Sequence, residues 1–365
     1  MIRLGLYGAG NRTKALLDAL WLDELYRVEC VYDINPAQSE ALAACYGGKV
    51  CCTPEELVSN SNVDAFLISL SPFDHAEALR KTIPAGRPVF VEKPVSFSGA
   101  EVSALADLAE QYQVPVQVGF MRRYLPESLE ALRFIRDNDP GMIFNVDCTW
   151  VHHGDTEMNY CLTHQKDNFR LKVSQIPFHC CHMLDIQLLM GGPVQYVHAE
   201  GFKLTQRPYP SPDDLTAQLK FASGANGNFH YSSMVYYTEF SYRFNAENYS
   251  LKMNGGTDQL MIYRRPRFRT MQMGPRPEER KDFAAFNASY ERNCLPQKIN
   301  FSKGVDLANV HIMEDFVRMV QDNKAPAANL RQAARVQGLA EGMELSAKLR
   351  KTIEFTEKGI VAEQK

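Results

Sequence analysis

The chain has 365 residues, of which 45% are hydrophobic and 23% charged, and its formal net charge is −3. This is the composition of an ordinary globular protein, and the length suggests about two domains. The absence of a basic surplus argues against nucleic acid or an anionic membrane as the main partner, and no apolar run approaches the ~20 residues of a membrane span.

Two features favour a reduced, cytoplasmic protein. The first residues, MIRLGLYGAGNRTK, alternate in polarity and do not form the apolar core of a secretory signal. The nine cysteines are odd in number and irregularly spaced, which is not the pattern of a disulfide framework.

In the first part of the chain, strand-like and helical patterns alternate. Thr53 and Pro54 are an N-cap and a first helical residue, so a helix is expected to begin there. The strand-like runs are residues 2–10, 26–33, 63–71, 88–94 and 114–120, and the helical runs are 13–22, 52–60, 75–86 and 99–113. This alternation predicts a doubly wound parallel sheet, a domain that we assign to residues 1–121.

From residue 122 to 365 the strand-like runs lie closer together. They are residues 142–152, 194–202, 215–224, 226–234, 239–247 and 249–256, with helical runs at 176–192, 308–324 and 329–351. The pattern predicts an α+β domain with a mostly antiparallel sheet. Aromatic and polar residues alternate in 229–234 and 240–244, which is consistent with a sheet face that pairs with another subunit. The basic, proline-rich stretch 263–283 favours a long surface loop, although its arginines could bind an anion.

The segment Gly8-Ala9-Gly10-Asn11-Arg12-Thr13 stands between the first strand and the first helix, where dinucleotide-binding proteins carry their fingerprint. Gly8 allows the tight turn, and Gly10 allows the pyrophosphate to approach the helix N-terminus. We therefore expect Gly8, Gly10, Asn11 and Arg12 to bind the cofactor, although Thr13 replaces the third glycine.

An acid follows the second strand. Asp33 stands 25 residues after Gly8, where a carboxylate can accept both ribose hydroxyls and would repel the 2′-phosphate of NADP. This favours NAD over NADP. Arg12 keeps NADP open, because it could reach a phosphate as well as the pyrophosphate.

Glu92-Lys93-Pro94 ends another strand of the predicted parallel sheet. Ligands of such sheets bind beyond the carboxyl ends of the strands. The three residues are therefore expected in the active site, with a surface ion pair beside a turn as the alternative.

The helical run 176–192 contains His179, His182 and Asp185 at spacings of three, which places them on roughly one helical face. The H-C-C-H segment 179–182 does not predict a metal site, because the cysteines of a helix would point away from at least one histidine. No second cluster has zinc spacing. His153 follows a strand and either borders the substrate pocket or lies in an exposed loop.

These features together resemble the Gfo/Idh/MocA family, NAD(P)-dependent oxidoreductases of sugars and cyclitols. Residues 67–79 are similar to its T-P-x-x-x-H loop, 118–126 to its G-F-x-R-R-F segment, and 182–192 to its H-x-x-D-x-L-x-x-L-x-G helix. The resemblance covers residues 2–350 and implies a Rossmann domain, a carbohydrate-binding second domain, and a homodimer or homotetramer.

The resemblance also implies roles for individual residues. Lys93 would contact the reacting hydroxyl and the nicotinamide ribose, with Glu92 holding it and Pro94 turning the chain, a cis bond being an option. Ser71 and His75 would cover the nicotinamide end of the cofactor. Arg123, His153 and Asp185 are the expected substrate-binding residues beside Lys93.

The catalytic helix departs from the family pattern. His182 matches the family's catalytic histidine, but the aspartate four residues before it is replaced by Phe178. Either His179 takes over from the adjacent position, or His182 and Lys93 act alone.

Three functions follow, and the leading one is a dehydrogenase of sugar or cyclitol hydroxyls. The altered helix leaves open a redox-assisted glycosidase that oxidises, eliminates and reduces again on tightly held NAD. A regulator that binds dinucleotide without catalysis is disfavoured, because such relatives tend to lose the lysine of E-K-P and this chain keeps Lys93.

Overall fold

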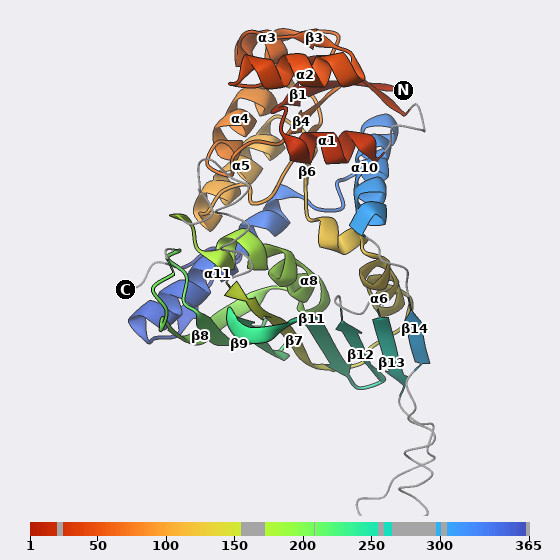
Figure 1. Cartoon of the computed structure of the whole chain (residues 1–365). Helices are drawn as coiled ribbons and strands as arrows, with labels where there is room; N and C mark the ends of the chain where they lie inside the picture. Colours follow the sequence, from red (N-terminus) through yellow and green to blue (C-terminus); the bar gives the residue numbers. More distant parts are fainter. Residues whose placement is uncertain are drawn as a thin grey trace, which may run out of the picture.

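The computed structural model describes residues 1–19, 25–154, 172–207, 209–254, 259–264, 297–300 and 305–362. The first domain holds a six-stranded parallel sheet of order β3-β2-β1-β4-β5-β6 (Figure 1), which confirms the predicted doubly wound sheet. Its strands are β1 (Ile2–Tyr7), β2 (Tyr26–Tyr32), β3 (Lys49–Val50), β4 (Ala65–Ile68), β5 (Val89–Val91) and β6 (Val116–Val118). The central strands β4 and β5 are buried throughout, as expected for strands covered on both faces.

Helices α1 (Asn11–Asp18), α2 (Pro36–Tyr46), α3 (Pro54–Ser59), α4 (His75–Thr82) and α5 (Gly99–Gln111) connect these strands. Thr53 caps α3 as predicted, since its hydroxyl accepts the backbone N–H of Glu56 at 3.1 Å. Helix α2 was not predicted, although Asn35 and Pro36 form the same kind of start: the Asn35 side chain accepts the N–H of Ala37.

The second sheet contains nine strands within the described residues, in the order β14-β13-β12-β11-β7-β10-β9-β8-β15. All its pairs are antiparallel except β7 with β10, so the predicted mostly antiparallel sheet is confirmed. The strands are β7 (Ile143–His153), β8 (Val194–Phe202), β9 (Asp214–Phe221), β10 (Asn226–Ser232), β11 (Met234–Ala246), β12 (Tyr249–Asn254), β13 (Gln259–Arg264), β14 (Gln297–Asn300) and β15 (Ile353–Glu354). Helices α6 (Pro126–Asp137), α8 (Cys181–Gly191) and α11 (Leu330–Leu349) pack on one face.

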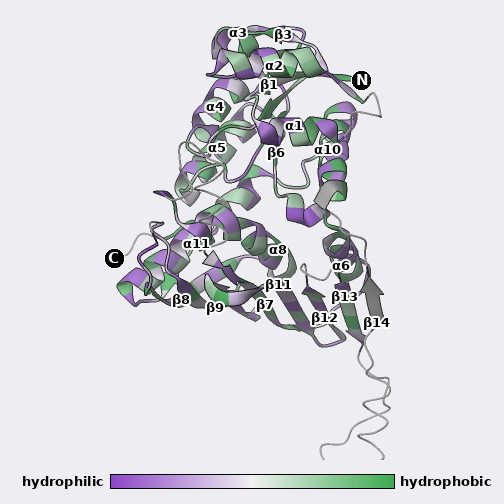
Figure 2. Cartoon of the chain, in the orientation of Figure 1, coloured by the Kyte–Doolittle hydropathy of each residue, from purple (hydrophilic) through white to green (hydrophobic). Residues whose placement is uncertain are grey.

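Four aromatic residues of the predicted pairing segments 229–234 and 240–244 are buried in the core of this chain, which contradicts their interpretation as a pairing surface. Phe229, Tyr231 and Phe244 are fully buried, and Tyr242 is nearly so. The other face is polar: Asn145, for example, bonds to the side chains of both Asp147 and Asn245 at 2.7 Å. The alternation of hydrophobic and hydrophilic residues along these strands (Figure 2) therefore serves the core of one subunit. Oligomerisation stays a prediction.

Helix α10 (Val305–Asp322) returns to the first sheet, beside α1 (Figure 1). Phe316 and Ile312 share a buried cluster with Leu4, Leu6 and Phe90, and the rings of Phe90 and Phe316 are 5.6 Å apart. The predicted domain boundary at residue 121 does not include this helix. Part of the first domain's core comes from residues beyond 304.

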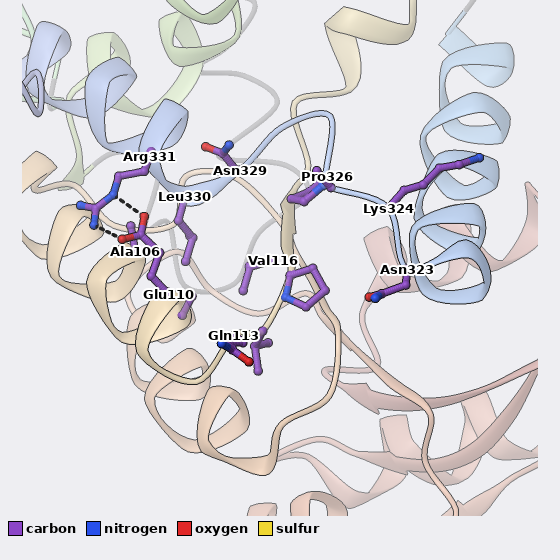
Figure 3. Close-up of a pocket in the computed structure, with 14 residues that line it drawn as sticks. Ala106, Glu110, Gln113, Val116, Asn323, Lys324, Pro326, Asn329, Leu330 and Arg331 are labelled. Carbon is purple, nitrogen blue, oxygen red and sulfur yellow. Dashed lines mark hydrogen bonds and ion pairs between the residues drawn. The ribbon is translucent and has the colours of Figure 1, made fainter.

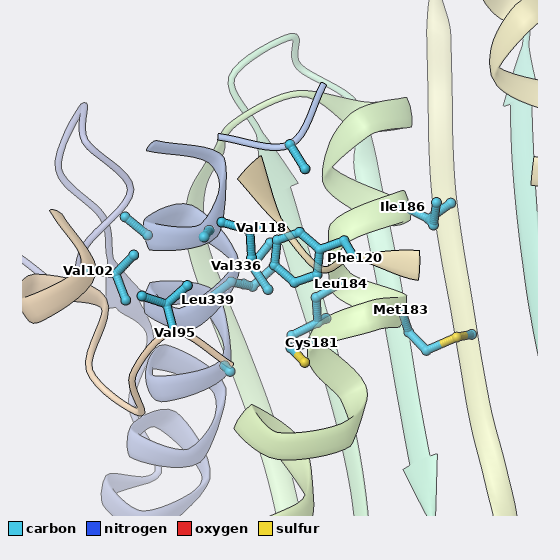
Figure 4. Close-up of a cluster of buried hydrophobic side chains, with 14 of the residues drawn as sticks. Val95, Val102, Val118, Phe120, Cys181, Met183, Leu184, Ile186, Val336 and Leu339 are labelled. Carbon is cyan, nitrogen blue, oxygen red and sulfur yellow. The ribbon is translucent and has the colours of Figure 1, made fainter. Parts of the chain in front are cut away.

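A second buried cluster joins the two domains, and Figure 4 shows Val118 and Phe120 from the end of β6 against Leu184 of α8 and Val336 of α11. Helices α5 and α11 cross closely, since a Cβ on Gly99 would lie 2.7 Å from the backbone of Gly338. This packing sets the N-terminal end of α8 against the carboxyl edge of the parallel sheet.

The same interface contains a buried acid that makes stability depend on pH. Glu344 of α11 accepts a hydrogen bond from the Ser174 hydroxyl, and burial raises the pKa of Glu344 to about 7 from 4.5. Between these values the folded chain keeps a proton that the unfolded chain has lost, so the free energy of unfolding falls as pH rises. The contribution is fully present below pH 4.5, is lost as pH rises through about 7, and amounts to roughly 3 kcal/mol.

We expect Glu344→Gln to gain stability relative to the wild type as pH rises from 4.5 to 8. Urea midpoints measured across this range check the prediction, with the exposed Glu357→Gln as the matched control. Parallel pH profiles for Glu344→Gln and the wild type would contradict the assignment.

Candidate functional site

The glycine turn joins β1 to α1 with two glycines that have different tasks. Gly8 has a φ of 106°, and a Cβ there would lie 2.2 Å from the carbonyl oxygen of Ser69 on β4's side of the sheet. Gly10, with φ −78°, faces open space, because a Cβ there would meet no atom within 4 Å. Thr13 fills the place of the third glycine and donates its hydroxyl to the carbonyl oxygen of Gly8 at 2.9 Å, which ties the helix to the turn.

Asp33 lies directly after β2 and beside this turn. Its carboxylate accepts the backbone N–H groups of Ala9 at 2.8 Å and of Asn35 at 2.9 Å. A carboxylate offers about four acceptor positions, so two further donors can be accommodated. The free N–H groups of the first turn of α1, the open approach at Gly10 and this acid fit the pyrophosphate and ribose of a dinucleotide.

The two glycines give a matched pair of variants. Gly10→Ala is expected to weaken NADH binding about tenfold or more, roughly 1.4 kcal/mol, because the new methyl enters the space in front of the helix. Its effect on the cofactor-free fold should stay below about 1 kcal/mol. Gly8→Ala should instead lower the thermal midpoint of the cofactor-free protein, since both φ and the Ser69 carbonyl oppose a side chain. NADH fluorescence titration and thermal unfolding separate the two effects, and equal loss of stability in both variants would contradict this prediction.

Glu92 is buried at the end of β5 and organises the segment around Lys93. Its carboxylate binds the Arg12 guanidinium at 2.7 Å and accepts the backbone N–H of Lys93 at 3.1 Å. The second arm of Arg12 donates to Asn309 of α10 at 2.8 Å. The Lys93–Pro94 peptide bond is cis, as the family resemblance allowed. Glu92 thus holds the backbone of Lys93, and Arg12 extends toward β5.

Lys93 reaches across to the second domain. Its Nζ donates to the backbone carbonyl of Phe178 at 3.3 Å and lies 4.8 Å from the centroid of the Phe178 ring. The residue that replaces the family's aspartate therefore still contacts the lysine, through a carbonyl oxygen and an aromatic face. Sequence reasoning missed this contact, because nothing in a phenylalanine signals the use of its backbone.

His75 is completely buried and connects two loops of the site. Leu70 donates its backbone N–H to Nε2 at 3.1 Å, so the proton of the ring is on Nδ1, which donates to the carbonyl oxygen of Pro94 at 2.8 Å. Burial lowers the pKa of His75, which keeps this neutral form. His75 thereby fixes the segment of Ser71 against the cis-proline turn, with both ring nitrogens engaged inside the protein.

His182 stands in the first turn of α8, and only 7% of its surface is exposed. Its Nδ1 has no hydrogen-bond partner in the described part of the chain. Burial, and then the positive charges of Lys93, Arg122 and Arg12, hold the pKa of His182 well below 6.5. The imidazole is therefore neutral at pH 7, beside the lysine.

His179 does not continue the helical face of His182, because it lies in a π-helical turn, η5 (Ile176–Cys180), that precedes α8. Its ring stacks on Trp150, with centroids 5.9 Å apart and planes 9° from parallel. The guanidinium of Arg122 also lies over Trp150, 5.2 Å from the ring centroid. Arg122 was not among the predicted site residues, although the adjacent pair of arginines in the sequence was a signal.

Arg123 and Asp185 are paired with each other and buried, with side chains 6% and 2% exposed. The guanidinium binds both carboxylate oxygens and also reaches the carbonyl oxygen of Ala327 and the side chain of Gln332. The structure thus places these two predicted substrate-binding residues in a clamp between η3 (Met121–Tyr124), α8 and the start of α11.

The remaining predictions concern His153, the basic stretch 263–283, metal binding and membrane spans. His153 is partly exposed at the end of β7 and stacks on Tyr236 with centroids 5.0 Å apart. Most of the basic stretch 263–283 lies outside the described residues. The described residues contain no group of three or more His, Cys, Asp or Glu side chains arranged to hold a metal. No helix among them is long and apolar enough to cross a membrane.

A cavity of about 370 Å³ lies elsewhere, between α5, the start of β6 and the segment joining α10 to α11 (Figure 3). Val116 and Leu330 line it, and the Arg331–Glu110 ion pair closes one side. Because it borders the amino end of β6, it is at the edge of the sheet opposite to Lys93.

Two family models match the chain. Residues 2–120 match an oxidoreductase family with an NAD-binding Rossmann fold, and residues 129–252 match the Gfo/Idh/MocA C-terminal domain. The chain therefore belongs to the Gfo/Idh/MocA oxidoreductase family.

Named relatives are similar only in part. The chain is 31% identical over 146 residues to the rhizopine catabolism protein MocA of Rhizobium meliloti, covering 40% of this chain and 46% of the relative. It is 31% identical over 234 residues to scyllo-inositol 2-dehydrogenase (NAD(+)) of Bacillus subtilis, covering 62% and 63%. The chain thus spans about half to two thirds of the length of these curated relatives. A levoglucosan dehydrogenase in complex with NADH has the same fold, with a TM-score of 0.77 at 17% identity over 97% of this chain and 98% of that one.

Proposed function

We propose that this protein is an NAD-dependent dehydrogenase that oxidises a hydroxyl of a sugar or cyclitol, or reduces the corresponding ketone. The observation that supports it most is that Lys93 and His182, whose Nδ1 has no hydrogen-bond partner among the described residues, both lie at the carboxyl edge of the Rossmann sheet. Bound NAD supplies the hydride acceptor.

The residues of the chain handle the proton. As the substrate carbon gives up its hydride, the hydroxyl loses its proton to the neutral ring of His182, or to Lys93 in its neutral amine form, and a carbonyl forms. Positive charge nearby favours the developing alkoxide, which is where preorganised groups contribute most. The low pKa of His182 keeps the ring able to accept a hydrogen bond from the hydroxyl.

NAD is the proposed cofactor in preference to NADP. Asp33 would accept the ribose hydroxyls, and its charge opposes a 2′-phosphate. Arg12, the residue that could favour NADP, is instead bound to Glu92 and Asn309.

A redox-assisted glycosidase is the second candidate, and Phe178 in place of the aspartate is the observation that favours it. A panel of sugars, cyclitols and glycosides, each with NAD and NADP, separates the two candidates through absorbance of the reduced cofactor. Net NADH formation on a free polyol supports the dehydrogenase. Cleavage of glycosides without net NADH formation supports the glycosidase, and inertness toward the whole panel would support a non-catalytic regulator.

A further inference from the structure

Arg122 is a cation at the site that has no counter-ion among the described residues. It lies in η3 next to the buried Arg123, and its guanidinium is 4.6 Å from the ring centroid of Phe240 and 5.2 Å from that of Trp150. Contact with two aromatic faces fixes the position of the group without using its N–H donors. In contrast to Arg123, Arg122 has no carboxylate and no side-chain hydrogen bond within the described part of the chain.

The surroundings of Arg122 also contain buried polar groups that have no hydrogen-bond partner within the described part of the chain. The indole N–H of Trp150, a residue only 7% exposed, is buried and has no acceptor among the described residues, and an indole can only donate. The Nδ1 of His182, also 7% exposed, likewise has no hydrogen-bond partner among the described residues, and in the neutral ring it can donate or accept according to the tautomer. A buried polar group without a partner costs about 1–3 kcal/mol. Such groups around one site indicate that a bound molecule supplies their hydrogen-bond partners, with an acceptor for the indole N–H.

The described residues of the site carry more positive than negative charge, which also favours an anionic ligand. Lys93, Arg122 and Arg12 all lower the pKa of His182, so all three positive charges act on the same space. Glu92 neutralises Arg12 at 2.7 Å. Phe178, where the family pattern has an aspartate, contributes no negative charge, and nothing described offsets Arg122.

We propose that the substrate of this site carries an anionic group, a carboxylate or a phosphate, and that Arg122 binds it. The inference rests on the proposed dehydrogenase and names its substrate class: a sugar acid or sugar phosphate in place of a neutral polyol. A planar guanidinium matches the two oxygens of either group in a bidentate pair. Trp150 and Phe240 contact the guanidinium without using its N–H donors, which stay free for that pair.

Binding can be measured without turnover, because the chain has only two tryptophans, Trp21 and Trp150. In a Trp21→Phe protein saturated with NAD, Trp150 fluorescence is titrated with D-glucuronate, glucose 6-phosphate and D-glucose. Acetate and inorganic phosphate at equal ionic strength are the controls. We expect at least one sugar anion to bind at least tenfold more tightly than glucose and than both simple anions. The glucuronate and phosphate arms tell the two anionic groups apart, and the absence of any such advantage overturns the proposal.

Variants then test the residue. Arg122→Gln should abolish the advantage of the sugar anion with the thermal midpoint maintained, and Arg122→Lys should restore only part of it, because an ammonium cannot form the bidentate pair. Arg133→Gln, an equal change of charge on the exposed side of α6, should have no effect. An unchanged affinity in Arg122→Gln overturns the assignment.

The outcomes separate this inference from the function on which it rests. If neutral polyols are oxidised in a Lys93-dependent reaction that Arg122→Gln leaves unchanged, the proposed dehydrogenase function is supported and the proposed anionic substrate class is wrong. If sugar anions bind through Arg122 but none is oxidised with NAD or NADP, the anion site stands and the dehydrogenase falls.

Discussion

Lys93→Ala is expected to lower kcat/KM for the oxidation of the substrate hydroxyl by about 10²- to 10⁴-fold, the usual contribution of a positioned acid–base group. The side chain reaches the carbonyl oxygen of Phe178 and the ring above it, at the edge of the sheet where the nicotinamide is proposed to lie. Stopped-flow or steady-state absorbance of NADH measures the loss. Affinity for NADH should change little, because the glycine turn and Asp33 remain.

Two controls make the result specific. Lys93→Arg keeps the positive charge but not a group that exchanges protons near neutral pH, so it should be nearly as inactive as Lys93→Ala. Lys81→Ala, which removes a surface lysine of α4 paired with Glu55, should retain full activity. A Lys93→Ala enzyme that turns over at the wild-type rate would rule out the proposed proton transfer and leave His182 as the remaining candidate.

Asp185→Ala is expected to reduce the free energy of unfolding by about 3–5 kcal/mol, because it leaves the Arg123 guanidinium buried without its counter-ion. Arg123→Met should have a similar effect. The double variant Arg123→Met/Asp185→Leu should recover much of the loss, since two apolar side chains need no partner. Urea midpoints of the wild type and the three variants measure these differences.

The same series decides between a structural and a substrate-binding role for this pair. For comparison, Glu130→Ala breaks the exposed Arg133–Glu130 pair and should cost less than about 1 kcal/mol. A structural clamp predicts loss of stability with an unchanged KM in whatever fraction stays folded. A raised KM with an unchanged urea midpoint would restore the substrate-binding role expected from the family pattern.

The local patterns of the chain were enough to predict the backbone features of the proposed cofactor site. Glycines after a strand, an acid ending the next strand and the alternation of strands with helices are properties of short segments, and each has a direct backbone cause. The parallel sheet, the glycine turn with Gly8 in its left-handed conformation, and the cis-proline after Lys93 all agree with those patterns. The helix that begins at Pro36 was not predicted, although Asn35 followed by proline is a recognisable N-cap sequence.

Contacts between distant segments were beyond the reach of those patterns. Spacing placed His179, His182 and Asp185 on one face, but the π-helical turn shifts the register, and each side chain then meets a different neighbour. Spacing also could not tell which face of β10 and β11 the helices would cover, and Phe229, Tyr231, Tyr242 and Phe244 proved to be core.

The adjacent residues Arg122 and Arg123 show most clearly what the sequence alone cannot determine: the partners of a side chain. Both arginines follow β6 and have the same local sequence context. The short motif that contains them predicts only that one or both lie near the site. Packing of α8 against η3 gives Arg123 a buried carboxylate, while β7 and β11 give Arg122 two aromatic rings and no acid. The partners of the two arginines are 28 to 118 residues away in the chain. Only the tertiary structure brings them together, and it thereby decides that Arg123 is paired inside the protein and that Arg122 is the arginine proposed to bind a ligand.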